Sequence, residues 1–147
     1  MSERPYTRVI GMLNGVGLRP TRQRLALAKL LFDGADRHVT AEELHAQALG
    51  ANVSVSLATV YNTLHQFTAV QLLREVVVEP GRSYFDTNVT DHHHFFFEDS
   101  GAIQDIPEES VSIAQLPRIP EGTTLNRVDV VVRLAGQPAG GMASDTD

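Results

Sequence analysis

The first half of the chain carries three helix-start signals in quick succession. Thr21 precedes apolar residues at helical spacing that reach Phe32. Residues 40–43, Thr-Ala-Glu-Glu, form a capping box for a second helix, which Gly50 ends. Ser56 can cap a third helix through its side-chain oxygen. The sequence therefore predicts three short helices joined by short connections.

A hairpin is expected after the third helix. Two strand-like segments, 72–79 and 82–87, flank Pro80-Gly81, which suits the two central positions of a type II turn. Three short helices followed by a two-stranded hairpin are typical of a winged helix, whose third helix enters the major groove of DNA. Short helical trios also occur without DNA binding, so both interpretations stay open at this point.

The predicted third helix has two different faces. Val60, Leu64 and Phe67 form an apolar stripe that we expect in the core. A second stripe is uncharged and rich in hydrogen-bonding groups. It consists of Thr59, Asn62, Thr63 and Gln66, with Tyr61 beside it. Such a face is suited to reading the edges of base pairs.

Charge is distributed unevenly along the 147 residues. The net charge is −6 at pH 7. Residues 1–89 carry nine Lys and Arg against eight Asp and Glu, whereas residues 90–147 carry three against ten. Residues 1–32 carry six basic side chains against one acidic side chain. A basic beginning and an acidic second half indicate that one part contacts an anion and the other does not, although a solvated charged helix face is the alternative.

The second half predicts a smaller domain, and the fold class is α+β. Its elements would be strands at 92–97, 102–106 and 126–134 and a short helix at 108–116. We expect the chain to consist of a winged-helix DNA-binding domain (1–87), a hinge (88–91), an α/β dimerisation and ligand-sensing domain (92–135) and a disordered tail (136–147). Because about 50 residues bury little surface, dimerisation would complete the core of the second domain.

Asp91-His92-His93-His94 is the strongest chemical signal in the chain. On a strand, His92 and His94 share a face with their Cα atoms about 6.6 Å apart, close enough to chelate one ion, while His93 points the opposite way. Imidazoles with the neighbouring carboxylates form a nitrogen and oxygen donor set that suits manganese, iron(II) or zinc. A polar strand edge with solvated histidines is the alternative.

Haem is a second possibility for the same histidines. Histidine is a usual axial ligand of haem iron, and residues 95–97, Phe-Phe-Phe, would offer apolar surface to a porphyrin. A buried strand is the favoured interpretation of that phenylalanine run.

Several functional classes are excluded by what the sequence lacks. The chain has no cysteine, which rules out disulfides, thiolate zinc sites and iron–sulfur clusters. No apolar run approaches the roughly 20 residues of a membrane helix, and no secretory signal is visible, so we expect a soluble intracellular protein. A metal-dependent hydrolase is the competing class, but the sequence carries no GxSxG, no HExxH and no phosphate-binding glycine loop.

Three segments carry a family resemblance. They are Gly-Leu-Arg-Pro-Thr-Arg-Gln-Arg at 17–24, Leu-Ala-Thr-Val-Tyr-Asn at 57–62 and the histidine run. Through these segments the chain resembles the ferric-uptake-regulator family over about residues 15–135. Within that family the sequence is similar to the iron-response regulators of alpha-proteobacteria. The resemblance implies a cytoplasmic homodimeric transcription regulator with an N-terminal winged helix and a C-terminal α/β dimerisation domain.

The resemblance also implies how an operator is read. Tyr61 would contact a thymine methyl group, and Arg19 would reach the minor groove of A·T-rich, palindromic double-stranded DNA. Asn62 stands where family members usually have arginine, and asparagine is suited to bidentate contact with adenine. The full DNA-contacting set would be Arg19, Ser56, Thr59, Tyr61 and Asn62.

The family's regulatory metal site maps onto five positions. They are His38, Asp86, His92, His94 and Asp105, with aspartate at two places where glutamate is usual. A second family site would include Asp91 and His93, but its other ligands are missing. Phe97 and Ser100 stand where many members carry the Cys-x-x-Cys pair of a structural zinc, so no structural zinc held by four cysteines is expected.

Iron-response regulators sense haem, which relieves their DNA binding. Some carry a cysteine-proline haem motif, which this chain lacks, so the resemblance leaves His92, His93 and His94 as the haem ligands. It implies control of genes for haem synthesis and iron homeostasis, with a haem-synthesis enzyme as haem donor. A regulator corepressed by manganese, iron or zinc is the alternative.

Overall fold

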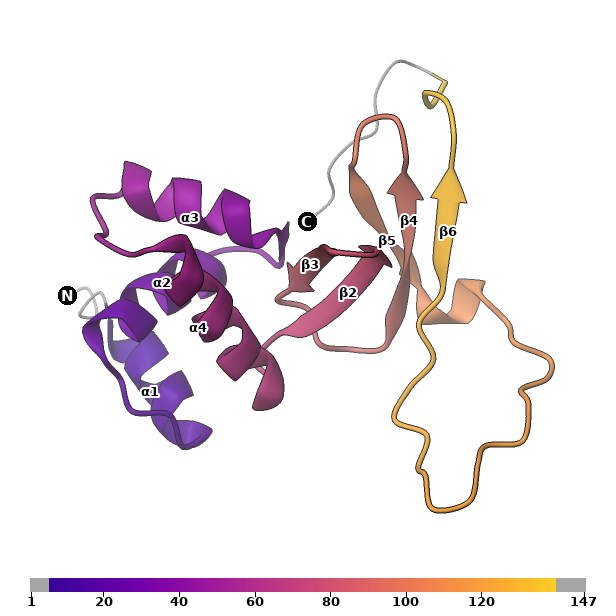
Figure 1. Cartoon of the computed structure of the whole chain (residues 1–147), viewed down its shortest axis with the longest axis horizontal. Helices are drawn as coiled ribbons and strands as arrows, with labels where there is room; N and C mark the ends of the chain where they lie inside the picture. The colour runs from indigo at the N-terminus through magenta and orange to yellow at the C-terminus, as the bar shows by residue number, and fades with distance from the viewer. Residues whose placement is uncertain (1–5, 140–147) are drawn as a thin grey trace. The chain divides into compact units, whose positions relative to one another are not determined.

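The computed structural model describes residues 6–139 and divides the chain into two compact units, Met1–Val89 and Thr90–Asp147 (Figure 1). Helices and small sheets are both present, which confirms the predicted α+β class. None of the helices in residues 6–139 combines the length and the apolar composition that spanning a bilayer requires.

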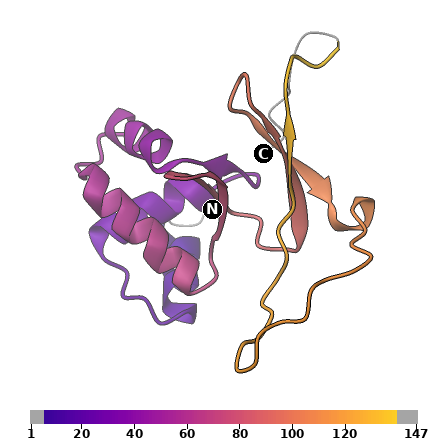
Figure 2. The same cartoon turned by 45° about the vertical axis from the view of Figure 1, so that its right-hand side comes forward.

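Four helices build most of the first unit in the described residues. They are α1 (Thr7–Gly15), α2 (Arg22–Phe32), α3 (Ala41–Gly50) and α4 (Leu57–Ala69). α4 packs against α2 and α3 (Figures 1 and 2). The predicted helix starts are confirmed: Thr21 and Ser56 accept hydrogen bonds from the backbone N–H of Arg24 (3.3 Å) and Thr59 (3.1 Å).

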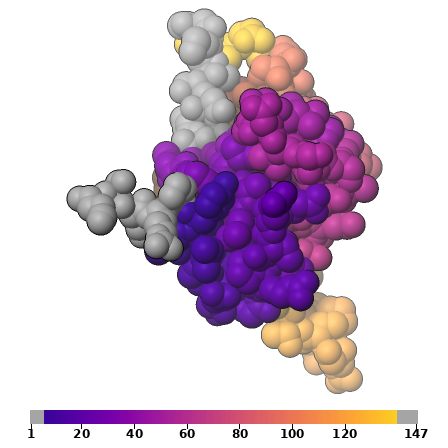
Figure 3. All heavy atoms as spheres, turned by 90° about the vertical axis from the view of Figure 1, so that its left-hand side faces the viewer, coloured from indigo at the N-terminus to yellow at the C-terminus, as the bar shows by residue number. Residues whose placement is uncertain are grey.

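The helix α1 was not predicted. It has no side-chain N-cap and only nine residues, so its local signals are weak. Val9 and Leu13 are buried one turn apart, and the Arg8 guanidinium donates to the carbonyl oxygen of Phe32 at the end of α2 (2.5 Å). Packing therefore stabilises this helix more than its own sequence does. Figure 3 shows its indigo surface on the face of the unit turned to the viewer.

The core of the first unit lies where the helices meet. The apolar stripe predicted for α4, Val60, Leu64 and Phe67, is fully buried. The Phe67 ring lies against the Phe32 ring of α2, with centroids 6.1 Å apart. This burial anchors one side of α4 and leaves the other side facing solvent.

The wing is a three-stranded antiparallel sheet in the order β1-β3-β2. Its strands are β1 (His38–Val39), β2 (Arg74–Glu79) and β3 (Arg82–Asp86). The β2–β3 hairpin was predicted, and Gly81 has the positive φ of 76° that its place in the turn requires. The two-residue β1 was not predicted, and it places His38 opposite Asp86.

The capping box of α3 allows a direct stability test. The backbone N–H of Thr40 donates to Glu43 Oε1 (2.8 Å), and the backbone N–H of Glu43 donates to Thr40 Oγ1 (3.1 Å). Replacing Thr40 with alanine should lower the free energy of unfolding by about 1 kcal/mol, because an orphan N–H loses its acceptor. Urea denaturation followed by helical circular dichroism measures the change. Gln47→Ala, on the exposed face of α3, is the control and should change stability by less than about 0.5 kcal/mol.

The second unit is a three-stranded sheet in the order β5-β4-β6. β4 (His92–Phe97) pairs antiparallel with β5 (Ile103–Pro107) and parallel with β6 (Val131–Leu134). Phe96, Phe97, Ile103 and Ile106 are buried. The favoured interpretation of the phenylalanine run as a buried strand therefore agrees with the structure.

The helix predicted at 108–116 is wrong. Only Glu108–Ser110 forms a single 3-10 turn, and residues 111–120 have no regular structure. β-Branched Val111 and Ile113, with two serines between and before them, disfavour a short helix, and Pro117 prevents its extension. The strand predicted from 126 begins only at Val131. Of the predicted tail 136–147, residues 140–147 lie outside the described part of the chain.

Candidate metal centre and nucleic-acid interface

Two histidines and one aspartate converge in the second unit. His92 Nε2 lies 3.3 Å and His94 Nε2 lies 3.5 Å from the same oxygen, Asp105 Oδ1. The two imidazole rings are 4.6 Å apart between centroids. The strand alternation of β4 places both histidines on one face, and the β4–β5 register sets Asp105 directly opposite His94. Both histidines are buried, while Asp105 is partly exposed.

The hydrogen bonding of His92 suits the role of a metal ligand. Its Nδ1 lies 2.6 Å from the carbonyl oxygen of Thr90, which can only accept, so Nδ1 carries the hydrogen. In the neutral imidazole, Nε2 then presents its lone pair toward the Asp105 carboxylate. A metal ion between the two groups would accept this lone pair, whereas a proton on Nε2 would instead make the contact an ion pair. The carbonyl that fixes the ring is the usual outer partner of a metal-binding histidine.

A second histidine–aspartate pair lies in the wing of the first unit. His38 Nε2 is 3.0 Å from Asp86 Oδ2, and both side chains are 1% exposed. The other carboxylate oxygen, Asp86 Oδ1, accepts a hydrogen bond from the backbone N–H of Asn88 (2.9 Å). Cross-strand pairing of β1 with β3 brings the two residues together.

Arg74 is a buried cation in the same row of the wing. It is the cross-strand partner of Asp86 on β2, so the three side chains of Arg74, Asp86 and His38 emerge from adjacent strands on one face of the sheet. Arg74 is only 3% exposed. Sequence reasoning missed this residue because nothing local distinguishes it from exposed arginines such as Arg19 and Arg22.

The donor chemistry fits a divalent metal ion. The five residues implied by the family resemblance are divided between the units: His38 and Asp86 lie in the first, and His92, His94 and Asp105 lie in the second. In the second unit, the ligand atoms of the three residues lie within 4.8 Å of one another. Imidazole nitrogens and carboxylate oxygens without thiolates suit manganese, iron(II) or zinc.

His93 is separated from the other two histidines of the run. Its Nδ1 accepts a hydrogen bond from the backbone N–H of Val130 (3.1 Å), next to β6. It lines a cavity of about 260 Å³ together with Asp91, Glu108 and Arg127. That volume lies below the roughly 300–1,000 Å³ of small-molecule sites. His92 and His94 lie on one face of β4 and His93 lies on the other, so the three histidines do not bind one ligand from a single face.

The expected DNA-contacting residues lie in two parts of the first unit. Arg19 is exposed in the connection before α2, and Ser56, Thr59, Tyr61 and Asn62 lie in the first turns of α4. The Ser56 hydroxyl also donates to Thr59 Oγ1 (3.0 Å), so these two side chains together cap the N-terminus of the helix. Asn62 is exposed and available to a base edge.

The expectation that Thr63 belongs to the reading face is wrong. Thr63 is only 5% exposed, because it lies three residues after Val60 and four before Phe67 on the core side of the helix. Gln66 is exposed, and its Oε1 accepts a hydrogen bond from Arg24 Nε (3.2 Å), which joins α4 to α2.

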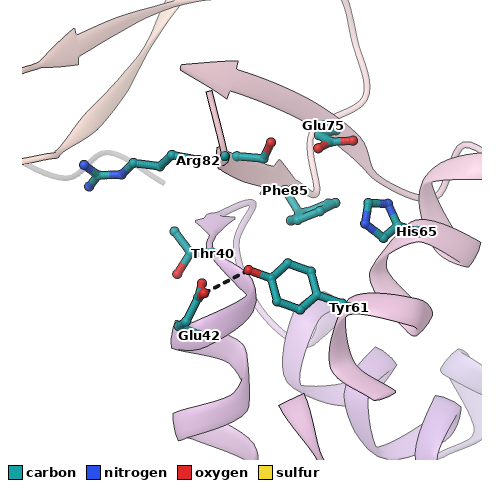
Figure 4. Close-up of a pocket in the computed structure, with 9 residues that line it drawn as sticks. Thr40, Glu42, Tyr61, His65, Glu75, Arg82 and Phe85 are labelled. Atoms are coloured by element: carbon teal, nitrogen blue, oxygen red, sulfur yellow. Dashed lines mark hydrogen bonds between the residues drawn. The ribbon is translucent and has the colours of Figure 1, made fainter. Parts of the chain in front are cut away.

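Tyr61 is held by a residue that sequence reasoning used only as part of a cap. Its hydroxyl donates to Glu42 Oε2 (2.8 Å) at the start of α3, and Figure 4 shows the ring pointing from α4 toward that carboxylate. This hydrogen bond, followed by burial and the charge of Glu42, raises the pKa of Tyr61 above its ordinary value. The ring of His65 stacks beside Tyr61 with centroids 6.3 Å apart.

Comparisons with known proteins agree on one family. A model of the ferric uptake regulator family matches residues 15–133. The chain is 32% identical over 109 residues to the ferric uptake regulation protein of Cupriavidus metallidurans, covering 70% of this chain and 76% of that protein. It is 30% identical over 104 residues to the ferric uptake regulation protein of Escherichia coli K12, covering 70% of each.

Solved structures show the same fold. The ferric uptake regulator of Vibrio cholerae matches with a TM-score of 0.69 at 22% identity, covering 87% of this chain and 99% of that one. The ferric uptake regulator of Pseudomonas aeruginosa, solved with manganese, matches with a TM-score of 0.66 at 23% identity, covering 87% and 97%. With most of its length matched by the family model and its fold shared with these regulators, the chain belongs to the ferric uptake regulator family.

Proposed function

We propose that the protein is a metal-responsive transcriptional regulator that binds operator DNA as a homodimer, and that it is not an enzyme. The observation that carries this proposal is a buried histidine–aspartate pair in a winged helix, followed closely in the chain by a buried His-x-His pair that contacts a partly exposed aspartate. Asp86 ends the wing and His92 begins β4, so only residues 87–91 separate the two donor sets. The relatives are named as regulation proteins, which supports a regulator rather than a hydrolase.

The two donor sets together would hold one manganese, iron or zinc ion, as a Lewis-acidic centre with five nitrogen and oxygen donors. His38 and Asp86 would bind from the wing, and His92, His94 and Asp105 would bind from the sheet of the second unit. Residues 88–91 would act as a hinge whose freedom is restricted when both sets share an ion. The bound ion would then regulate operator binding, because its ligands would hold the winged-helix unit in one position.

Operator recognition would use the exposed side of α4. Tyr61 and Asn62 would face bases in the major groove, Ser56 and Thr59 would contact the backbone near the helix N-terminus, and Arg19 would reach the minor groove. A dimer presents two such helices, so we propose a palindromic, A·T-rich operator with half-sites about one helical turn apart.

Haem-controlled release, as in iron-response regulators, is the rival form of this function. It would use His92, His93 and His94, with haem delivered by a haem-synthesis enzyme and with genes of haem synthesis and iron homeostasis as targets. The burial of all three histidines favours a small ion over a porphyrin. The two forms predict opposite responses, since a corepressor metal strengthens DNA binding and haem weakens it.

Fluorescence anisotropy on a labelled A·T-rich palindrome tests the proposal. Manganese should strengthen operator binding by the full-length protein, and haem should not release it. A matched pair of variants locates the response: His92→Ala should remove the manganese effect, whereas His93→Asn, which preserves an acceptor for the Val130 N–H, should retain it. If haem releases the operator and this release depends on His93, the metal form of the proposal is wrong. If neither manganese nor haem changes operator affinity, ligand control is wrong altogether.

A further inference from the structure

Glu42 occupies a fixed position beside the proposed recognition helix. It is the second residue of α3, whose start is set by the capping box of Thr40 and Glu43. Its neighbours Ala41 and Leu44 are buried, so the helix cannot rotate without exposing them. Glu42 itself is exposed, and its Oε2 accepts the hydroxyl hydrogen of Tyr61 at 2.8 Å.

Two further rings lie in a row beside the Tyr61 ring. His65, one turn later on α4, stacks beside Tyr61 with an interplanar angle of 17°. The His65 ring meets the ring of Phe85 edge-on, with centroids 5.7 Å apart. Phe85 lies in β3 and is buried in the core, so this row of rings is anchored in the wing. These residues line a cavity of about 520 Å³, shown in Figure 4.

The hydrogen bond changes what Tyr61 can offer to DNA. Because the hydroxyl hydrogen is donated to Glu42, it is unavailable to a phosphate or a base acceptor. The hydroxyl oxygen can still accept a hydrogen bond, and the apolar ring remains free to contact the methyl group of thymine. The carboxylate also repels nearby phosphates, so it lowers affinity for every sequence equally.

We propose that Glu42 is a specificity-determining residue that fixes Tyr61 for thymine recognition and weakens binding to DNA in general. The inference rests on the proposed function, in which Tyr61 faces the operator. The Glu42 carboxylate weakens binding to all DNA sequences through charge repulsion, and it also holds the Tyr61 ring in the position that contacts thymine. A repulsive group of this kind increases specificity because only the correct base gains a compensating contact.

The test compares an operator containing thymine with the same operator containing uracil at the contacted positions, which removes only the C5 methyl groups. Manganese-loaded wild-type protein should bind the thymine operator more tightly by about fourfold per contacted methyl. Glu42→Ala and Tyr61→Phe should each reduce this ratio toward one, because both remove the bond that positions the ring. Glu42→Gln preserves an acceptor and should keep the ratio while tightening binding to both operators.

Glu75→Gln is the matched control. Glu75 lines the same cavity, so the substitution removes an equal charge without changing the acceptor of Tyr61. It should keep the wild-type ratio. If the Glu42→Ala protein has an unchanged circular dichroism spectrum and still shows the wild-type ratio of thymine to uracil operator affinity, the role of Glu42 is wrong. The proposed function would then remain intact. Equal binding of both operators by wild-type protein would overturn this inference together with the proposed contact of Tyr61.

Discussion

Replacing His94 with alanine should weaken manganese binding by at least about 100-fold and remove the metal-dependent gain in operator affinity. His94 is 1% exposed, and its Nε2 shares Asp105 Oδ1 with His92. Substitution of residues that only orient a metal ligand costs about 10–100-fold in metal affinity, so loss of a ligand should reach at least the upper end. Isothermal titration calorimetry with manganese measures the change directly.

His45→Gln is the control for this experiment. His45 Nε2 lies 3.1 Å from the carbonyl oxygen of Val55, and it lies outside the proposed donor set. The control should bind manganese like the wild type. Wild-type manganese affinity in the His94→Ala variant would show that the ion is held without His94, and the proposed donor set would then be wrong.

Replacing Asp86 with alanine should destabilise the protein by about 3–5 kcal/mol even when no metal is present. The substitution leaves the Arg74 guanidinium, 3% exposed, without the buried carboxylate opposite it in the sheet. Asp86 is 0% exposed, contacts His38 Nε2 at 3.0 Å and accepts the backbone N–H of Asn88, so its removal leaves buried polar groups without their acceptor. Urea denaturation in the presence of a chelator measures the loss.

A double variant separates the charge effect from a simple packing defect. Arg74→Met combined with Asp86→Ala removes both charges and should recover much of the lost stability. Asp33→Ala removes an exposed partner of Lys29 at the end of α2 and should cost less than about 1 kcal/mol. If the double variant is no more stable than Asp86→Ala alone, the arginine is not the source of the penalty.

Local sequence rules predicted the parts of the winged-helix unit that depend on neighbouring residues. The caps at Thr21, Thr40 and Ser56 and the turn at Gly81 involve contacts within a few positions, so their signals are complete in the sequence. The alternation that places His92 and His94 on one face of β4 is equally local. Helical spacing from Val60 and Phe67 also predicts that Thr63 is buried, so its assignment to the exposed face was an avoidable error.

The two elements that were not predicted, α1 and β1, depend on distant partners. α1 is held by Arg8 and by the burial of Val9 and Leu13, none of which a capping rule detects. The helix expected at 108–116 had a plausible length but lacked strong helix formers, and a short helix without a packing surface is marginal. β1 has two residues and exists because β3 pairs with it.

The sequence by itself determined the α+β class, the helix starts, the hairpin and the chemistry of the donors, because composition, spacing and capping are local properties. Only the tertiary structure decided which donors meet. Strand pairing places Asp105 beside His94 and His38 beside Asp86, and helix packing places Glu42 beside Tyr61. These contacts join residues far apart in the chain, and their geometry follows from register and packing, which short-range patterns do not encode.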